Sequence, residues 1–271
     1  MRAVERDHDP ARRALTPFLD ERELIEVEHE RRYDTCVPLR AVFLDIGDTL
    51  VEGWSPRERL NELMREALVR EFGEREWYDA FVGAEFGPAA GAETHRQETN
   101  RWLEEWFTNS GYGLDDVAVD RLRSTGSVPL DLVAQLVPGA ADALRWSKSN
   151  GLTIGLVTNT LWRGDDEVWE DLRRFGLHEL VDHVVSSHSV GWQKPHQEIF
   201  RRALELSSSP ADGAVMVGDR MLQDVWGAKR LGMRAVWRRP LAGAPQDPVD
   251  VEPDASIDDL TELPAVLERW M

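Results

Sequence analysis

The chain has 271 residues, of which 42% are hydrophobic and 30% charged, and its formal net charge is −18 at neutral pH. This length is enough to bury a sizeable core, while the excess of carboxylates repels nucleic acid and anionic membranes, so we expect neither as a partner. No apolar stretch approaches the roughly 18 residues that are needed to cross a bilayer.

Residues 1–38 are highly charged and show little periodicity, which favours an extension over a separate domain. The first residues, MRAVERDHDPARR, lack the apolar centre of a secretory signal. The lone Cys36 permits neither an intramolecular disulfide nor a multi-cysteine metal cluster. We therefore expect the protein in the cytoplasm. Nothing in the pattern indicates an oligomeric state.

A change of character at Leu39 marks the start of the core. The run LRAVFLDIGDTL is apolar and ends in Asp and Gly, which is typical of a buried parallel strand that emerges into a loop. Residues 52–135 then show helical periodicity, with stop signals at Gly73 and Gly111, and contain no convincing strand. We therefore predict an all-helical insert at 52–135, between the core segments 39–51 and 136–271.

From Val137 onward, helix-like and strand-like segments alternate. The pattern predicts helices at 138–151, 165–176, 195–207 and 224–232, and strands at 152–160, 181–188, 213–219 and 233–239. Strands that are separated by helices of about 10 to 15 residues indicate βαβ units and an α/β fold with a parallel sheet. We predict a Pro-rich surface loop at 240–256 and a closing helix at 257–270.

Polar residues close several of the predicted strands. Asp45, Thr158 and Asp219 each fall at the carboxyl end of a strand, and Lys194 lies in the loop after another. Taken singly, such residues are often only helix caps or surface groups. Because the carboxyl ends of parallel strands share one edge of a sheet, where ligands bind, we expect these four residues to converge on one site.

The types of these residues suit phosphate chemistry. A carboxylate such as Asp45 acts as a nucleophile on phosphorus or carbon. Thr158 and Asn159 offer a hydroxyl and backbone N–H groups to phosphoryl oxygens, and Lys194 neutralises the anion. Asp219 and Asp224, five residues apart across a strand-to-helix turn, suit a hard cation that keeps several waters, which favours Mg²⁺ over zinc.

With these motifs in order, the chain resembles a haloacid dehalogenase-superfamily hydrolase with a C1-type helical cap, over about residues 39–270. The segments that carry the resemblance are IGDTL, PGAADAL, LVTNT, GWQKPHQEIF and MVGDRMLQDVWGAKRLGM. The resemblance implies a Rossmann-like core with a helical cap inserted after the first motif, where the helical insert is predicted. It also implies a Mg²⁺-dependent phosphatase of a small phosphorylated metabolite.

The same resemblance implies a role for each motif residue. Asp45 corresponds to the nucleophile that forms an aspartyl-phosphate, Thr158 to a phosphate ligand and Lys194 to the catalytic lysine. Asp219 and Asp224 correspond to the acidic motif that holds Mg²⁺ together with Asp45.

The chain departs from the family pattern at Gly47. Family phosphatases have an Asp there, which protonates the leaving oxygen and later activates water, and dehalogenases of the family have an aromatic residue near this position. The Gly47 carbonyl still suits the metal and its N–H a phosphate oxygen, and Asp48 beside it belongs to the same phosphate-binding segment. Loss of a positioned acid–base typically costs about 10²–10⁴ in rate.

Two residues are candidates to replace the missing acid–base. On an extended segment Asp48 points away from Asp45, so only an unusual turn brings its carboxylate back, and we expect it to cap the turn into the helical insert. His95 lies on a predicted helix of the insert, where a lone His is more often a solvated surface group.

Three hypotheses follow from the sequence. The first is a Mg²⁺-dependent phosphatase of a small metabolite, whose substrate could have a good leaving group that needs little protonation, such as an acyl or aryl phosphate. The second is a carbon-centre hydrolase such as a 2-haloacid dehalogenase, against which the intact acidic motif counts. The third is a phosphate-binding pseudoenzyme with a regulatory role, in which Gly47 marks decayed chemistry.

Overall fold

The computed structural model describes residues 37–54, 56–84, 98–113, 118–160, 162–240 and 249–271. The chain divides into two compact units, Met1–Cys36 and Val37–Met271, and all the described residues belong to the second. The expected N-terminal extension, apart from its last two residues, and the candidate base His95 lie outside the described residues.

A six-stranded parallel sheet forms the centre of the second unit. Its order is β5 (His183–Ser186), β4 (Thr153–Thr158), β1 (Ala41–Leu44), β6 (Ala214–Gly218), β7 (Arg234–Arg238) and β8 (Ala255–Ile257), and every neighbouring pair runs parallel. All four residues of β1 are fully buried, as expected for a strand that is covered on both faces.

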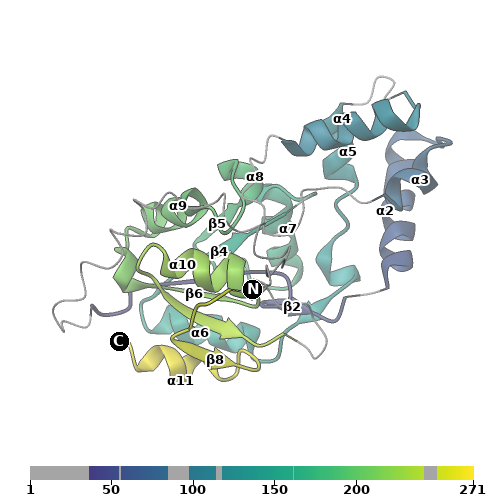
Figure 1. Cartoon of the computed structure of the whole chain (residues 1–271). Coiled ribbons are helices and arrows are strands. Elements are labelled where there is room, and N and C mark those ends of the chain that lie inside the picture. The colour runs from purple at the N-terminus through teal and green to yellow at the C-terminus, as the bar shows by residue number, and fades with distance from the viewer. Residues whose placement is uncertain (1–36, 55, 85–97, 114–117, 161, 241–248) are drawn as a thin grey trace, which may run out of the picture. The chain divides into compact units, whose positions relative to one another are not determined.

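Helices cover both faces of this sheet (Figure 1). One face packs against α6 (Ala140–Ser149), α7 (Asp165–Arg174) and α11 (Leu263–Glu268), and the other against α9 (Gln197–Ser207) and α10 (Gly227–Lys229). Helix α9 buries Ile199, Phe200 and Ala203, which share one side at helical spacing. Three short segments complete the core: α8 (Ser187–Val190), η3 (Ala211–Gly213) and the turn η4 (Met221–Trp226).

The helical segments within residues 53–134 pack mainly around their own core. They are α2 (Arg57–Phe72), α3 (Tyr78–Val82), α4 (Glu98–Ser110), α5 (Val119–Thr125) and the short η2 (Leu130–Leu132). In this second core Trp77 meets Tyr78, Phe81 and Phe107 edge to face, with ring centroids 4.6–5.4 Å apart. Helix α2 ends where Gly73 adopts a φ of +73°, in agreement with the predicted stop signal.

The two ends of this helical block are hydrogen-bonded to each other. The strands β2 (Val51–Glu52) and β3 (Gln135–Leu136) form a two-stranded antiparallel sheet, with Val51 opposite Leu136. Each strand has only two residues, which is too short for any alternation of apolar and polar residues to show in the sequence. The chain therefore leaves the core and returns to it at one place.

The parallel α/β fold with a helical insertion after the first strand is confirmed, and two predictions for the C-terminal part are wrong. Residues 255 and 256, predicted as loop, belong to β8, which pairs with the outer edge of β7. Asp254 stabilises this pairing, because its carboxylate accepts hydrogen bonds from Ala235 N at 2.8 Å and Lys229 Nζ at 2.7 Å. The closing helix starts only at Leu263, since Ile257 is used in β8.

None of the helices in the described ranges is long and apolar enough to cross a membrane.

Candidate active site

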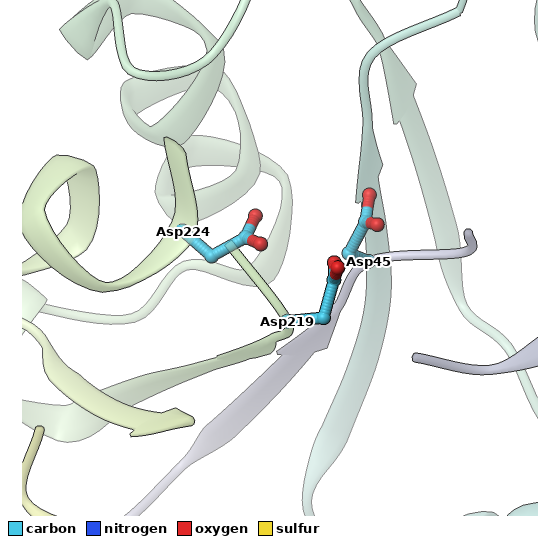
Figure 2. A group of neighbouring side chains, drawn as sticks. All are labelled: Asp45, Asp219 and Asp224. Atoms are coloured by element: carbon cyan, nitrogen blue, oxygen red, sulfur yellow. The ribbon is translucent and has the colours of Figure 1, made fainter. Parts of the chain in front are cut away.

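Three carboxylates meet at the carboxyl edge of the sheet. Asp45 follows β1 and Asp219 follows the neighbouring strand β6, while Asp224 comes from η4, and Figure 2 shows the three side chains around a common space. One ligand oxygen from each lies within 4.8 Å of the others. Strand order reverses between β1 and β6, which is where open α/β sheets bind ligands.

The close approach of Asp224 depends on the glycine before Asp219. A Cβ on Gly218 would lie 2.2 Å from Asp224 Cγ, so no larger residue fits there without displacing that carboxylate. The segment from Met221 to Trp226 forms a wide π-helical turn, a geometry often found at functional sites, and it carries Asp224 toward the sheet.

Lys194 joins two of the three carboxylates. Its ammonium donates to Asp45 Oδ1 at 2.7 Å, to Asp224 Oδ1 at 2.6 Å and to the Val157 carbonyl at 2.7 Å, which uses all three of its N–H groups. The residue is only 2% exposed. Burial alone would lower the pKa of Lys194, but the charges of Asp224 and Asp45 outweigh burial and raise it, so the lysine is a fixed cation.

Asn159 fixes the backbone of Lys194. Its side-chain Nδ2 donates to the Lys194 carbonyl at 3.0 Å, and its Oδ1 accepts from the Lys194 N–H at 2.7 Å. Asn159 was predicted to bind phosphate through its backbone N–H, and this use of its side chain was not predicted. Thr158 is 4% exposed and ends β4, which pairs with β1, the strand that Asp45 follows.

The carboxylate of Asp219 has no such partner. Among the described residues, no hydrogen-bond donor reaches it, although the residue is only 6% exposed. Burial, together with the charges of Asp45 and Asp224, raises the pKa of Asp219 from 3.8 to about 8. A buried carboxylate without a protein donor is suited to contact with a bound cation.

The charges and donor types of the site fit Mg²⁺. Three carboxylates against the one ammonium of Lys194 leave a surplus negative charge, and oxygen donors are those that Mg²⁺ prefers. Both oxygens of Asp224 already accept hydrogen bonds, from Lys194 Nζ and from Arg220 N at 3.0 Å. Asp45 and Asp219 therefore have more free oxygen lone pairs for a direct bond to the metal than Asp224 has.

Strand β1 ends at Leu44, and the segment after Asp45 forms a turn instead of continuing as an extended chain. Asp48 has a φ of +50°, and its Oδ1 accepts a hydrogen bond from Trp54 Nε1 at 2.9 Å. The charge of Asp48 contributes to raising the pKa of Asp219, so the carboxylate is near the site. Alternation along an extended strand therefore does not describe the position of Asp48, and its hydrogen bond with Trp54 agrees with the predicted role in the turn toward the helical insert.

A buried arginine stabilises this turn. Arg238, at the end of β7, donates from Nη1 to the Asp48 carbonyl at 2.9 Å and forms an ion pair with Glu52. It is only 2% exposed. Arg238 was not predicted as a site residue, although a charged residue that closes an apolar strand was a visible signal in the sequence. Trp54 was also missed, because a single Trp in a loop carries no pattern.

Comparison with known proteins supports one family. The sequence profile of haloacid dehalogenase-like hydrolases matches residues 39–232. A phosphoserine phosphatase of Thermus thermophilus is 31% identical over 83% of this chain and 98% of its own. A glyceraldehyde 3-phosphate phosphatase of Pyrococcus furiosus is 28% identical over 85% of this chain and 94% of its own. The crystal structure of a 2-haloacid dehalogenase from Pseudomonas syringae covers 86% of this chain and 100% of its own, at 25% identity and a TM-score of 0.56.

Proposed function

The chain belongs to the haloacid dehalogenase-like hydrolases, and from this premise we propose that it is a Mg²⁺-dependent phosphatase of a small phosphorylated metabolite. Relatives named as phosphatases of two small phosphorylated compounds support the hydrolase class. The observation that carries the proposal is the buried carboxylate of Asp219, which has no donor in the described part of the chain and lies beside the nucleophile candidate.

In the proposed reaction Asp45 is the nucleophile. One of its oxygens attacks phosphorus, the bond from phosphorus to the leaving oxygen breaks, and the electron pair leaves with that oxygen. Lys194 donates a hydrogen bond of 2.7 Å to Asp45 Oδ1 and so orients the carboxylate. Water then cleaves the aspartyl-phosphate, which releases phosphate and restores Asp45.

Other residues bind the phosphoryl group and the cation. We propose that the Thr158 hydroxyl and the backbone N–H groups of Asn159 and Gly47 donate to phosphoryl oxygens. Asp45, Asp219 and the Gly47 carbonyl would hold Mg²⁺, which when bound offsets the negative charge of the phosphoryl group. Asp224 orients Lys194 and completes the acidic set.

We further propose that the helices α2–α5, within residues 52–135, form a cap of the C1 type that selects the substrate. Its support is the paired strands β2 and β3, which join both ends of the helical block to the core at one place. The core then comprises 39–51 and 136–271.

An assay with phenyl phosphate tests the phosphatase proposal. Hydrolysis is expected to require both Mg²⁺ and Asp45, so chelation of the metal or the variant Asp45→Asn should remove it. Asp45→Asn is a suitable change because the amide keeps the size of the side chain but is a poor nucleophile. Hydrolysis that persists without Mg²⁺ and in Asp45→Asn would refute the proposal.

Brief exposure to acetyl phosphate, followed by mass spectrometry, separates the alternatives. An adduct on Asp45 that turns over supports the phosphatase, whereas an adduct that persists indicates a phosphate-binding pseudoenzyme. Halide release from 2-chloropropionate without Mg²⁺ would instead identify a carbon-centre hydrolase, which the fold of the dehalogenase neighbour also accommodates.

A further inference from the structure

The side-chain position that Gly47 leaves empty adjoins a tryptophan. A Cβ built on Gly47 would lie 3.6 Å from Trp54 Cζ2. In the described part of the chain, this is its one contact within 4 Å apart from the residues on either side of Gly47. This is an ordinary van der Waals contact. The edge of the indole therefore lies beside the position from which a side chain at residue 47 would start.

A hydrogen bond fixes the orientation of this indole ring. Its Nε1–H donates to Asp48 Oδ1 at 2.9 Å, and the carbonyl of Asp48 is in turn held by the buried Arg238. The Trp54 side chain is nevertheless 43% exposed, and it is one of three large hydrophobic residues, with Leu132 and Met271, that are exposed in the described ranges. An aromatic ring is thus held partly open to solvent six residues after Asp48.

We propose that Trp54 binds the leaving group of the substrate and selects aryl phosphates. This inference rests on the proposed phosphatase function and names its substrate class. Aromatic rings gain specific stacking energy on an indole face, which an aliphatic group does not. A ring that is already oriented also loses little conformational entropy on binding.

The chemistry of Gly47 favours the same class. When Asp45 attacks phosphorus in an aryl phosphate, the bond to the phenolic oxygen breaks and its electron pair stays on that oxygen as phenolate. Phenols have a pKa near 10, as the tyrosine side chain does, so phenolate leaves without a positioned proton donor and later takes a proton from water. Gly47 supplies no such donor, and an aryl leaving group does not need one.

Binding of two phosphonates tests this proposal without any turnover. Titration calorimetry in Mg²⁺ compares phenylphosphonate with methylphosphonate, which share the anionic group and differ in the ring. The wild type is expected to bind phenylphosphonate more tightly. Trp54→Ala should lower the preference for phenylphosphonate over methylphosphonate about fivefold to tenfold, whereas Trp54→Phe should retain most of the preference.

Kinetics give a second readout with a matched control. Trp54→Ala should raise the KM for phenyl phosphate relative to the KM for acetyl phosphate, which has no ring. Leu132→Ala removes another exposed hydrophobic residue, in η2, and should change neither substrate.

An equal loss for both phosphonates in Trp54→Ala, or no preference for phenylphosphonate in the wild type, would overturn the inference. Failure of the phosphatase proposal has a different signature, because hydrolysis would then be independent of Asp45 while the phosphonate preference still reports on Trp54.

Discussion

Introducing a carboxylic acid at residue 47 should raise turnover, and the gain should be largest for substrates with poor leaving groups. Gly47→Asp places a Cβ at 3.6 Å from Trp54 Cζ2, so it introduces no clash at the backbone, and Gly47 is not among the residues with positive φ. A positioned general acid contributes about 10²–10⁴ in rate, equivalent to about 3–5 kcal/mol of transition-state stabilisation. We expect a gain within this range for an alkyl phosphate such as glycerol phosphate.

The assay compares kcat across substituted phenyl phosphates and alkyl phosphates, all in Mg²⁺. In the wild type kcat should fall steeply as the pKa of the leaving group rises, and Gly47→Asp should flatten that dependence. Gly47→Asn is the matched control, because it has nearly the same size and cannot act as an acid at neutral pH. The reasoning is refuted if Gly47→Asn produces the same gain, or if Gly47→Asp changes kcat equally for all leaving groups.

The remaining predictions concern charges in the core. In the metal-free protein the raised pKa of Asp219, about 8, means that the folded state holds a proton that the unfolded state has lost, so the free energy of unfolding should fall as pH rises from about 4 to 8. Asp219→Asn should remove that slope in urea titrations with chelator, and should also remove any stabilisation by Mg²⁺; an unchanged slope would contradict the assignment. Lys194→Met leaves two buried carboxylates without their cation and should cost about 3–5 kcal/mol of stability, measured by urea unfolding, so a loss below about 1 kcal/mol would count against the role of this lysine. For Asp182, burial raises the pKa, but hydrogen bonds from Ile154 N and Lys148 outweigh burial and lower it. Its stabilising contribution should therefore be present above about pH 4 and be lost as pH falls below that value, and Asp182→Asn should flatten this acid limb of the stability profile, whereas the surface control Asp142→Asn should not.

The convergence of Asp45, Thr158 and Asp219 was predictable because parallel strands place their carboxyl ends together, and the described structure has these strands side by side. The atomic contacts between these residues could not be predicted from the sequence. That Lys194 contacts both Asp45 and Asp224 depends on backbone positions set by η4, and the side-chain amide of Asn159 that fixes Lys194 belongs to a different loop. Contacts between distant segments leave no periodic pattern in a single sequence.

Strands and helices that carry a hydrophobic pattern in their own residues were predicted well. Elements that form only because a neighbouring strand or side chain contacts them were not. Strands such as β4 and β6 are apolar runs bounded by turn residues, and their hydrophobicity identifies them. By contrast, β8 has three residues after a Pro-rich run and is a strand only because β7 offers its edge. The contacts that hold the turn at Asp48 were missed for the same reason, since they come from Arg238 and Trp54.

The position of β1 in the middle of the sheet has a consequence for how the protein folds. Its two neighbours, β4 and β6, come more than about 100 residues later in the chain, so Ala41 pairs with Thr153 and Ala214. During synthesis the apolar segment AVFL emerges before the other five strands of the sheet, and it lacks its partner strands until most of the chain has been made. Asp45 is thus translated before the other candidate site residues but reaches its final position only after β4 and β6 have been made. We therefore expect activity to appear late in folding and in a single step.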